Sequence, residues 1–89
     1  MYKLYDTQQM GYSQDKNGDD ELFENLESVC SDLINYHESD TDVSEEYELC
    51  SNGEFIKCFD KLAEYGWELH NEQNEKITYE QLKSENLIK

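Results

Sequence analysis

Apolar residues recur at a helical period in two stretches of the chain. In the first stretch the stripe consists of Leu22, Phe23, Leu26, Val29, Cys30, Leu33 and Ile34. This spacing predicts an amphipathic helix over residues 20–37, with Asp19 or Asp20 as its N-terminal cap. In the second stretch the stripe consists of Phe55, Ile56, Phe59, Leu62 and Ala63. We expect this second helix to begin after a capping box at residues 51–54 and to end at Gly66.

Other stretches favour strands and turns. Residues 1–13 are rich in strand formers and predict a strand or hairpin, and residues 67–70 alternate like another strand. The Asn17-Gly18 pair predicts a loop. A capping box from Thr78 to Gln81 predicts a short C-terminal helix.

The acidic segment 38–48 is ambiguous. Val43, Tyr47 and Cys50 would share one face of a helix, but Tyr47 and Leu49 alternate as in a strand, and we interpret the segment as strand or irregular. The whole pattern predicts one α+β domain over residues 1–89. We expect a small antiparallel sheet packed against two main amphipathic helices, with a short C-terminal helix.

Charge changes the picture more than any motif does. The chain has 22 acidic residues against seven lysines, no arginine, and a net charge of −15. Solubility of a small domain needs a net charge of only about 2–8 in magnitude, and excess charge opposes folding by self-repulsion. The acids concentrate in residues 17–56, which contain no lysine. We therefore expect this part of the chain to attract a cationic surface.

The predicted first helix fixes which acids project away from the core. Glu21, Glu24, Glu27 and Asp32 would form a row of carboxylates about 5–6 Å apart. Such a row resembles the closely spaced charges of a nucleic-acid backbone. Exposed aromatic residues among the charges would anchor a partner, whereas Trp67 is expected in the core. The predicted partner-binding residues are Asp20, Glu21, Glu24, Glu27, Asp32, Tyr36, Asp40, Asp42, Glu45, Glu46 and Tyr47.

In size, charge and its carboxylate-faced helix at residues 20–32, the chain resembles a class of small inhibitors encoded by phages and plasmids. The class includes anti-CRISPR proteins, antirestriction proteins and inhibitors of uracil-DNA glycosylase, several of which are DNA mimics. The resemblance is one of size, charge and helix composition, and it includes no family motif. It implies a basic, nucleic-acid-binding host enzyme as partner, a competitive mechanism without a cofactor, and a location in the host cytoplasm.

Other functions stay open on the sequence. The acidic face can be a solvated surface or reflect a salt-loving proteome, and the chain can be an interaction module for some other basic protein. Asp15 to Asp19 resembles the start of a calcium-binding EF-hand loop, but that frame has Asp20 at its sixth position and Leu26 at its twelfth, where glycine and glutamate are needed. Weak calcium binding is therefore a further alternative.

Catalysis and membrane insertion have little support in the sequence. His37 and His70 belong to no recognisable catalytic or metal-binding motif, so we expect no enzyme, no metal and no cofactor. Three cysteines match no zinc or disulfide framework, and no signal-peptide pattern or apolar span is visible. We expect free thiols in a reducing cytoplasm, and no direct binding to nucleic acid or membranes, because both are anionic.

Overall fold

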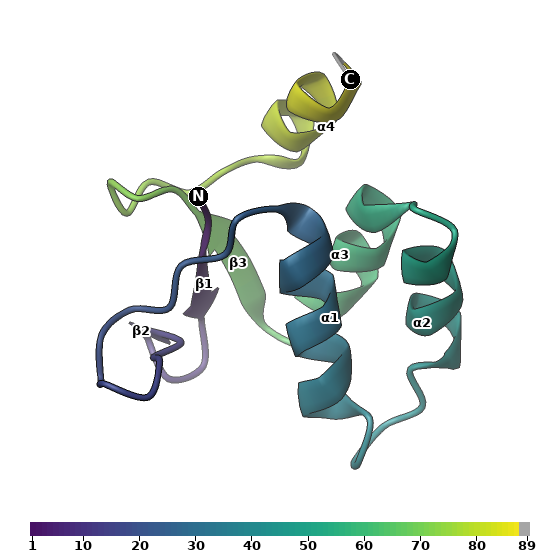
Figure 1. Ribbon diagram of the computed structural model, residues 1–89, viewed down its shortest axis with the longest axis horizontal. Coiled ribbons are helices and arrows are strands. Elements are labelled where there is room, and N and C mark those ends of the chain that lie inside the picture. Colours follow the sequence, from purple (N-terminus) through teal and green to yellow (C-terminus); the bar gives the residue numbers. More distant parts are fainter. Residues whose placement is uncertain (88–89) are drawn as a thin grey trace.

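A three-stranded antiparallel sheet and four helices make up residues 1–87, the part of the chain that this computed structural model describes (Figure 1). The strands are β1 (Lys3–Asp6), β2 (Gly11–Tyr12) and β3 (Trp67–His70). The helices are α1 (Leu26–His37), α2 (Ser44–Ser51), α3 (Phe55–Ala63) and α4 (Tyr79–Leu87). The predicted α+β class is confirmed.

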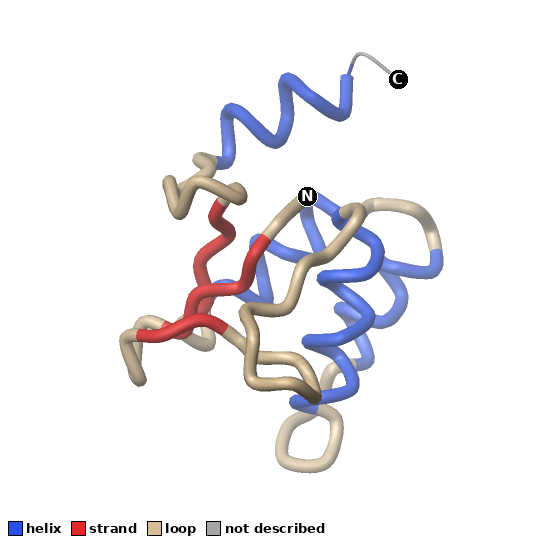
Figure 2. The backbone as a smooth tube through the Cα atoms, turned by 60° about the vertical axis from the view of Figure 1, so that its left-hand side comes forward, coloured by secondary structure: helices blue, strands red, loops and turns tan. Residues whose placement is uncertain are grey.

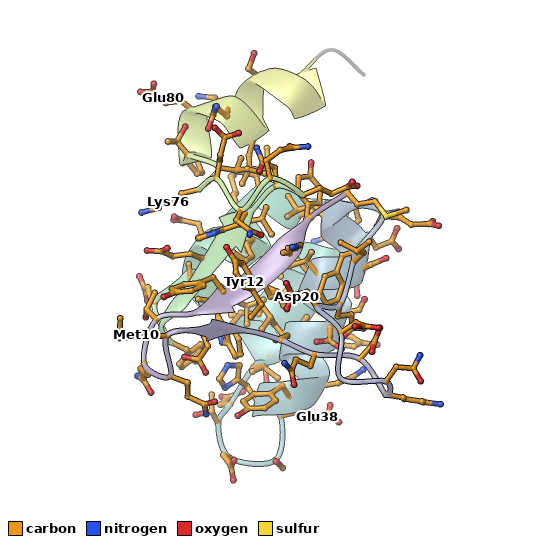
Figure 3. The ribbon with its side chains drawn as sticks, turned by 90° about the vertical axis from the view of Figure 1, so that its left-hand side faces the viewer. Met10, Tyr12, Asp20, Glu38, Lys76 and Glu80 are labelled. Atoms are coloured by element: carbon orange, nitrogen blue, oxygen red, sulfur yellow. The ribbon has the colours of Figure 1, made fainter. Side chains whose placement is uncertain are left out.

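The sheet has the order β2-β1-β3 and separates two unlike faces. Alternation along the strands turns Leu4, Trp67 and Leu69 into the hydrophobic core, on the side where α1, α2 and α3 lie (Figure 2). The opposite face carries Tyr5 and His70, whose rings stack with their centroids 4.9 Å apart. On that outer face Tyr12 and Asp20 lie near each other (Figure 3), and Lys3 contacts both.

The core forms where the apolar stripes of α1 and α3 meet the sheet. All the buried residues of α1 belong to the predicted stripe, namely Leu26, Val29, Cys30, Leu33 and Ile34. From α3 the core takes Cys58, Phe59 and Leu62. Each fully buried aliphatic or aromatic side chain stabilises the fold by about 1.5–3 kcal/mol. Trp67 is in the core, as expected, and its indole Nε1 donates to His37 Nε2 at 2.9 Å.

The first helix begins at Leu26, so the predicted start at residue 20 is wrong. The Phe23 amide donates to the Tyr2 carbonyl at 2.9 Å, and the Glu21 amide donates to the Ser13 carbonyl at 2.9 Å. These bonds hold residues 21–23 against the sheet in extended form, which leaves Leu22 exposed. The N-terminal cap is Asn25, whose side chain accepts from the Ser28 amide, and is neither Asp19 nor Asp20.

The acidic segment contains a helix, so its interpretation as strand or irregular is also wrong. At the start of α2, Asp42 Oδ1 accepts from the amide of Ser44 at 3.0 Å. The inward face carries Val43 and Glu46, whereas Tyr47 points outward. In the helical alternative Tyr47 would share a face with Val43, but in α2 it is Glu46 that lies on the buried face with Val43.

The helix ends confirm some predicted signals and correct another. Gly53 has a φ of +80° and follows the last turn of α2, where its amide donates to the Cys50 carbonyl. The predicted capping box at residues 51–54 is therefore wrong: the amides of residues 52–54 bond to carbonyls of α2 and close its C-terminus, and α3 begins after Glu54 without a side-chain cap bond. The box at Thr78 and Gln81 is confirmed by reciprocal bonds of 2.8 and 3.2 Å. Gly66 has the left-handed conformation expected of it, with a φ of +107°, but α3 itself ends earlier than predicted, at Ala63.

Candidate functional site

Four predicted carboxylates surround one hollow beside α1, which we call the acidic hollow. Glu21 and Glu24 come from the extended segment before the helix, and Glu27 and Asp32 come from α1 itself. The hollow has a volume of about 520 Å³, and its rim also carries Leu22, Ser28, Ser31 and Asn35. The four acids are therefore gathered by a strand-like segment folding back along a helix, and not by the single helical row that the sequence predicts.

The carboxylates of the acidic hollow are poorly compensated. None of them forms an ion pair with any residue in the described part of the chain. Partial burial raises the pKa of Glu21, and the charges of Asp32 and then Asp15 raise it further. Burial also raises the pKa of Asp32. These two shifts mean that the ionised forms of Glu21 and Asp32 oppose folding and that an approaching cation would relieve this opposition.

Two further hollows continue from the acidic hollow between α1 and α2, and both are lined by Tyr47. The first, of about 370 Å³, shares Glu27, Ser31 and Asn35 with the acidic hollow and includes Cys50. The second, of about 410 Å³, is bordered by Glu38 and Asp42. The Tyr47 side chain is 64% exposed and stands between them. Tyr47 is thus an exposed aromatic side chain near the carboxylates of Glu27, Glu38 and Asp42.

Tyr36 and Asp40 lie apart from these hollows. Tyr36 is 61% exposed, but its ring meets the Trp67 ring edge-on with their centroids 5.7 Å apart. Asp40 is exposed in the turn after α1, where its amide donates to the His37 carbonyl. Tyr36 therefore has a packing role on the sheet side of α1, and Asp40 extends the acidic surface only at the far end of the helix.

Three of the predicted residues are engaged within the protein. Glu46 is only 6% exposed, because it lies on the inward face of α2. The pKa of Tyr65 is raised mainly by burial and further by the charge of Glu46. Glu45 pairs with Lys61 at 2.8 Å, and Asp20 pairs with Lys3 at 3.1 Å. As a buried residue Glu46 leaves the candidate site, and the two paired acids have part of their charge offset.

Glu38 was missed in the sequence, although it borders the same hollow as Asp42. Its place depends on the turn between α1 and α2, which brings the end of one helix beside the start of the next. A prediction of helix for residues 44–51 would have indicated this position. Two consecutive helices joined by a short turn place Glu38 close to Asp42.

The loop that resembles an EF-hand uses its carboxylate internally. Asp15 Oδ1 accepts from the amides of Asn17 at 2.8 Å and Asp19 at 3.2 Å. Gly18 takes the left-handed conformation, with a φ of +84°. Among the described residues, no group of three or more acidic, cysteine or histidine side chains could hold a metal ion. The geometry is that of an Asn-Gly turn.

Both histidines pack against aromatic side chains and form hydrogen bonds with neighbouring residues. His37 accepts from Trp67 and stacks on Tyr65 with ring centroids 4.5 Å apart. His70 contacts Tyr12 through Nδ1 at 2.8 Å and Glu68 through Nε2 at 3.0 Å. The hydrogen bond from His70 is the main reason that the pKa of Glu68 is lowered.

The three cysteines are free thiols, of which Cys30 and Cys58 are buried and Cys50 is half-buried. The Cys30 thiol donates to the Phe55 carbonyl at 3.4 Å, and the Cys58 thiol donates to the Glu46 carbonyl at 3.3 Å. Burial is the main cause of the raised pKa of Cys50. A raised thiol pKa disfavours the reactive thiolate form at neutral pH.

Comparisons with known proteins give no match. No protein-family model, no curated protein and no solved structure resembles the chain closely enough to be assigned to it. Among the described helices, none has the length and apolar character needed to cross a membrane. The fold and the candidate site together define the protein only by its geometry. It is an α+β domain whose helical surface carries carboxylates that are unpaired within the described part of the chain and an exposed tyrosine.

Proposed function

We propose that this protein is a non-enzymatic, acidic inhibitor that binds the cationic, nucleic-acid-binding surface of a host enzyme. An RNA-guided nuclease is an example of such an enzyme, as for an anti-CRISPR protein. The acidic hollow and Tyr47 make the contact. The observation that carries the proposal is that four carboxylates from two segments surround one hollow without an ion pair in the described structure.

The physical basis of binding is the relief of repulsion. Partial burial disfavours the ionised forms of Glu21 and Asp32, and the charge of Asp32 adds to this effect at Glu21. Arginine or lysine side chains of a partner would neutralise them, as these residues neutralise phosphates in a nucleic-acid complex. Among the described residues, no lysine lines the acidic hollow or the two hollows beside Tyr47. The cations must therefore come from the partner.

Association would be fast at low salt and would slow steeply as salt is added, because attraction between net charges steers the encounter. Charge alone gives little specificity, so a buried anchor is needed. Tyr47 serves as this anchor, since its exposed ring can take a guanidinium group on its face. Inhibition follows from competition, because the enzyme surface that is occupied can no longer hold its DNA or RNA.

The test begins with affinity capture from nuclease-treated host lysate on immobilised protein. The captured protein should be released by short duplex DNA or structured RNA and by added salt. Release by salt but not by any nucleic acid would contradict the DNA-mimic mechanism. That outcome would instead favour an interaction module for another kind of basic protein.

A charge-reversed variant locates the binding surface. Substitution of Glu21, Glu24, Glu27 and Asp32 by lysine should abolish capture while circular dichroism shows an intact fold. The matched control reverses four other exposed acids by the same total charge, namely Glu64, Glu72, Glu75 and Glu80. The control should keep most of its binding. Equal loss in both variants would mean that net charge alone is recognised.

A further inference from the structure

The outer edge of β3 has backbone groups that point away from the sheet. The Ser13 amide donates to the Leu4 carbonyl at 2.9 Å, so the backbone groups of Leu4 face the β2 side of β1. Because these groups alternate along a strand, Lys3 and Tyr5 must face β3. Their registered partners there are His70 and Glu68. The amides and carbonyls of Trp67 and Leu69 consequently face the outer edge.

Residues 76–77 pair briefly with one end of this edge but do not form a fourth strand. The Ile77 amide donates to the Leu69 carbonyl at 2.8 Å, and a bridge joins His70 to Lys76. The capping box at Thr78 then turns the chain into α4. Within residues 1–87, the Trp67 amide, the Trp67 carbonyl and the Leu69 amide are left without a backbone partner.

A hollow of about 400 Å³ lies beside this edge, between α3, β3 and the start of α4. Apolar side chains line it, among them Phe59, Ala63, Ile77 and Leu82. Polar side chains line it as well, among them Asp60, Glu68 and Lys76, and Figure 3 shows Lys76 just below α4. An unpaired strand edge next to a partly apolar hollow meets both needs of strand addition, since the edge gives backbone bonds and the hollow takes a side chain.

We propose that the outer edge of β3 binds an extended, cationic segment of a partner polypeptide, which adds a strand opposite Trp67 and places one apolar side chain in the hollow. A cationic segment is favoured because the protein carries a net charge of −15 and Asp60 has no ion pair in the described structure. The same net charge disfavours a second copy of this chain at the edge. The surface is separate from the acidic hollow, and the proposal does not depend on the inhibitor function.

Amide hydrogen exchange of the unbound protein tests the premise. The amides of Glu68 and His70 are bonded to β1 and should exchange slowly, whereas those of Trp67 and Leu69 should exchange faster. Slow exchange at all four positions at low protein concentration would overturn the proposal, because the edge would then be covered. Protection of Trp67 and Leu69 that grows with protein concentration would also overturn it, in favour of pairing between two copies.

The binding test uses a short synthetic peptide of alternating lysine and valine. Titration into the isotope-labelled protein should shift the amide signals of Trp67 and Leu69, and the emission of Trp67, the single tryptophan of the chain, reports binding independently. The matched peptide has N-methylated valines, which keep the charge and lose backbone donors. It should bind at least about tenfold more weakly, as expected for lost backbone hydrogen bonds.

A blocking variant adds a second arm. Ala63→Arg would fill the hollow from α3, and Asn52→Arg adds the same charge at an exposed position away from it. The first should weaken peptide binding and the second should not. Equal binding of both peptides, or shifts confined to residues 21–32, would overturn the proposal, because the peptide would then recognise charge alone. The peptide comparison holds even if Ala63→Arg does not fold.

Discussion

The carboxylates of Glu21 and Asp32 border the same hollow although one lies in an extended segment and the other on α1. Asp32 is one of the causes that raise the pKa of Glu21, after partial burial. The unfolded chain separates the two groups, so their mutual repulsion is specific to the folded state. This is the cost that a partner's cations would remove.

Neutralising either carboxylate should stabilise the protein at neutral pH. A group whose pKa is raised by folding binds its proton more tightly in the folded state, so stability falls as pH rises from the unfolded pKa through the folded pKa. Glu21→Gln and Asp32→Asn should each raise stability at pH 7 by about 0.2–0.5 kcal/mol, the size of a surface like-charge pair. Urea unfolding measures the gain.

The pH dependence of that gain is diagnostic. It should shrink as pH falls and vanish below about pH 4, near the unfolded pKa of a carboxyl group. Asp40→Asn, in the exposed turn after α1, serves as the control and should leave stability unchanged. A gain for Glu21→Gln that persists unchanged at acid pH would contradict an electrostatic origin.

The position of the first helix cap gives a second prediction. Asn25→Ala removes the side-chain acceptor for the Ser28 amide, which lies 2.9 Å away. Loss of such a cap costs about 1 kcal/mol. Asp19→Ala, at one of the caps expected from the sequence, should cost much less, and thermal or urea unfolding of the two variants compares them. A larger loss for Asp19→Ala would place the helix start where the sequence pattern puts it.

The apolar periodicity correctly predicted the two helices whose orientation is set by packing in the core. The inward faces of α1 and α3 follow from apolar spacing because burial of those side chains fixes the helix rotation. The start of α1 could not be read in this way, since Leu22 and Phe23 continue the stripe. A long-range pair, Tyr2 with Phe23, overrides it by holding that segment beside β1.

The sequence allowed the kinds of residue in the candidate site to be predicted, but only part of their arrangement in space. Glu27 and Asp32 point away from the core as expected, because they lie opposite the apolar stripe of α1. The exposure of Tyr47 could not be derived in this way, since the pattern of residues 38–48 fixed no helix face. The burial of Glu46 was missed, since the helix in residues 44–51 carries only a weak apolar stripe and the sequence left its rotation undetermined. Ion pairs such as Glu45 with Lys61 join separate helices and leave no local pattern.

The two exposed tyrosines should respond differently to truncation. Tyr47 is an exposed ring beside the acidic hollow, so Tyr47→Ala should leave stability nearly unchanged and weaken capture of the partner by about tenfold or more. Tyr36 packs edge-on against Trp67, so Tyr36→Ala should instead lower stability and have the smaller effect on binding. Binding isotherms and urea unfolding of both variants separate the roles. If Tyr36→Ala is the one that loses binding, the contact lies on the sheet side of α1.

The turn from α3 into β3 should be intolerant of any side chain at Gly66. Its φ of +107° is a conformation that residues with a Cβ rarely adopt, and an added Cβ would lie 3.3 Å from Thr7 Oγ1. That hydroxyl donates to the Gly66 carbonyl at 2.8 Å, so it cannot move away without losing the bond. Gly66→Ala should therefore destabilise the protein by about 1–3 kcal/mol, measured by urea unfolding. Gly11→Ala is the control, because its φ is not positive and an added Cβ there meets no atom within 4 Å. Equal tolerance of both substitutions would mean that β3 does not enter the sheet through this turn.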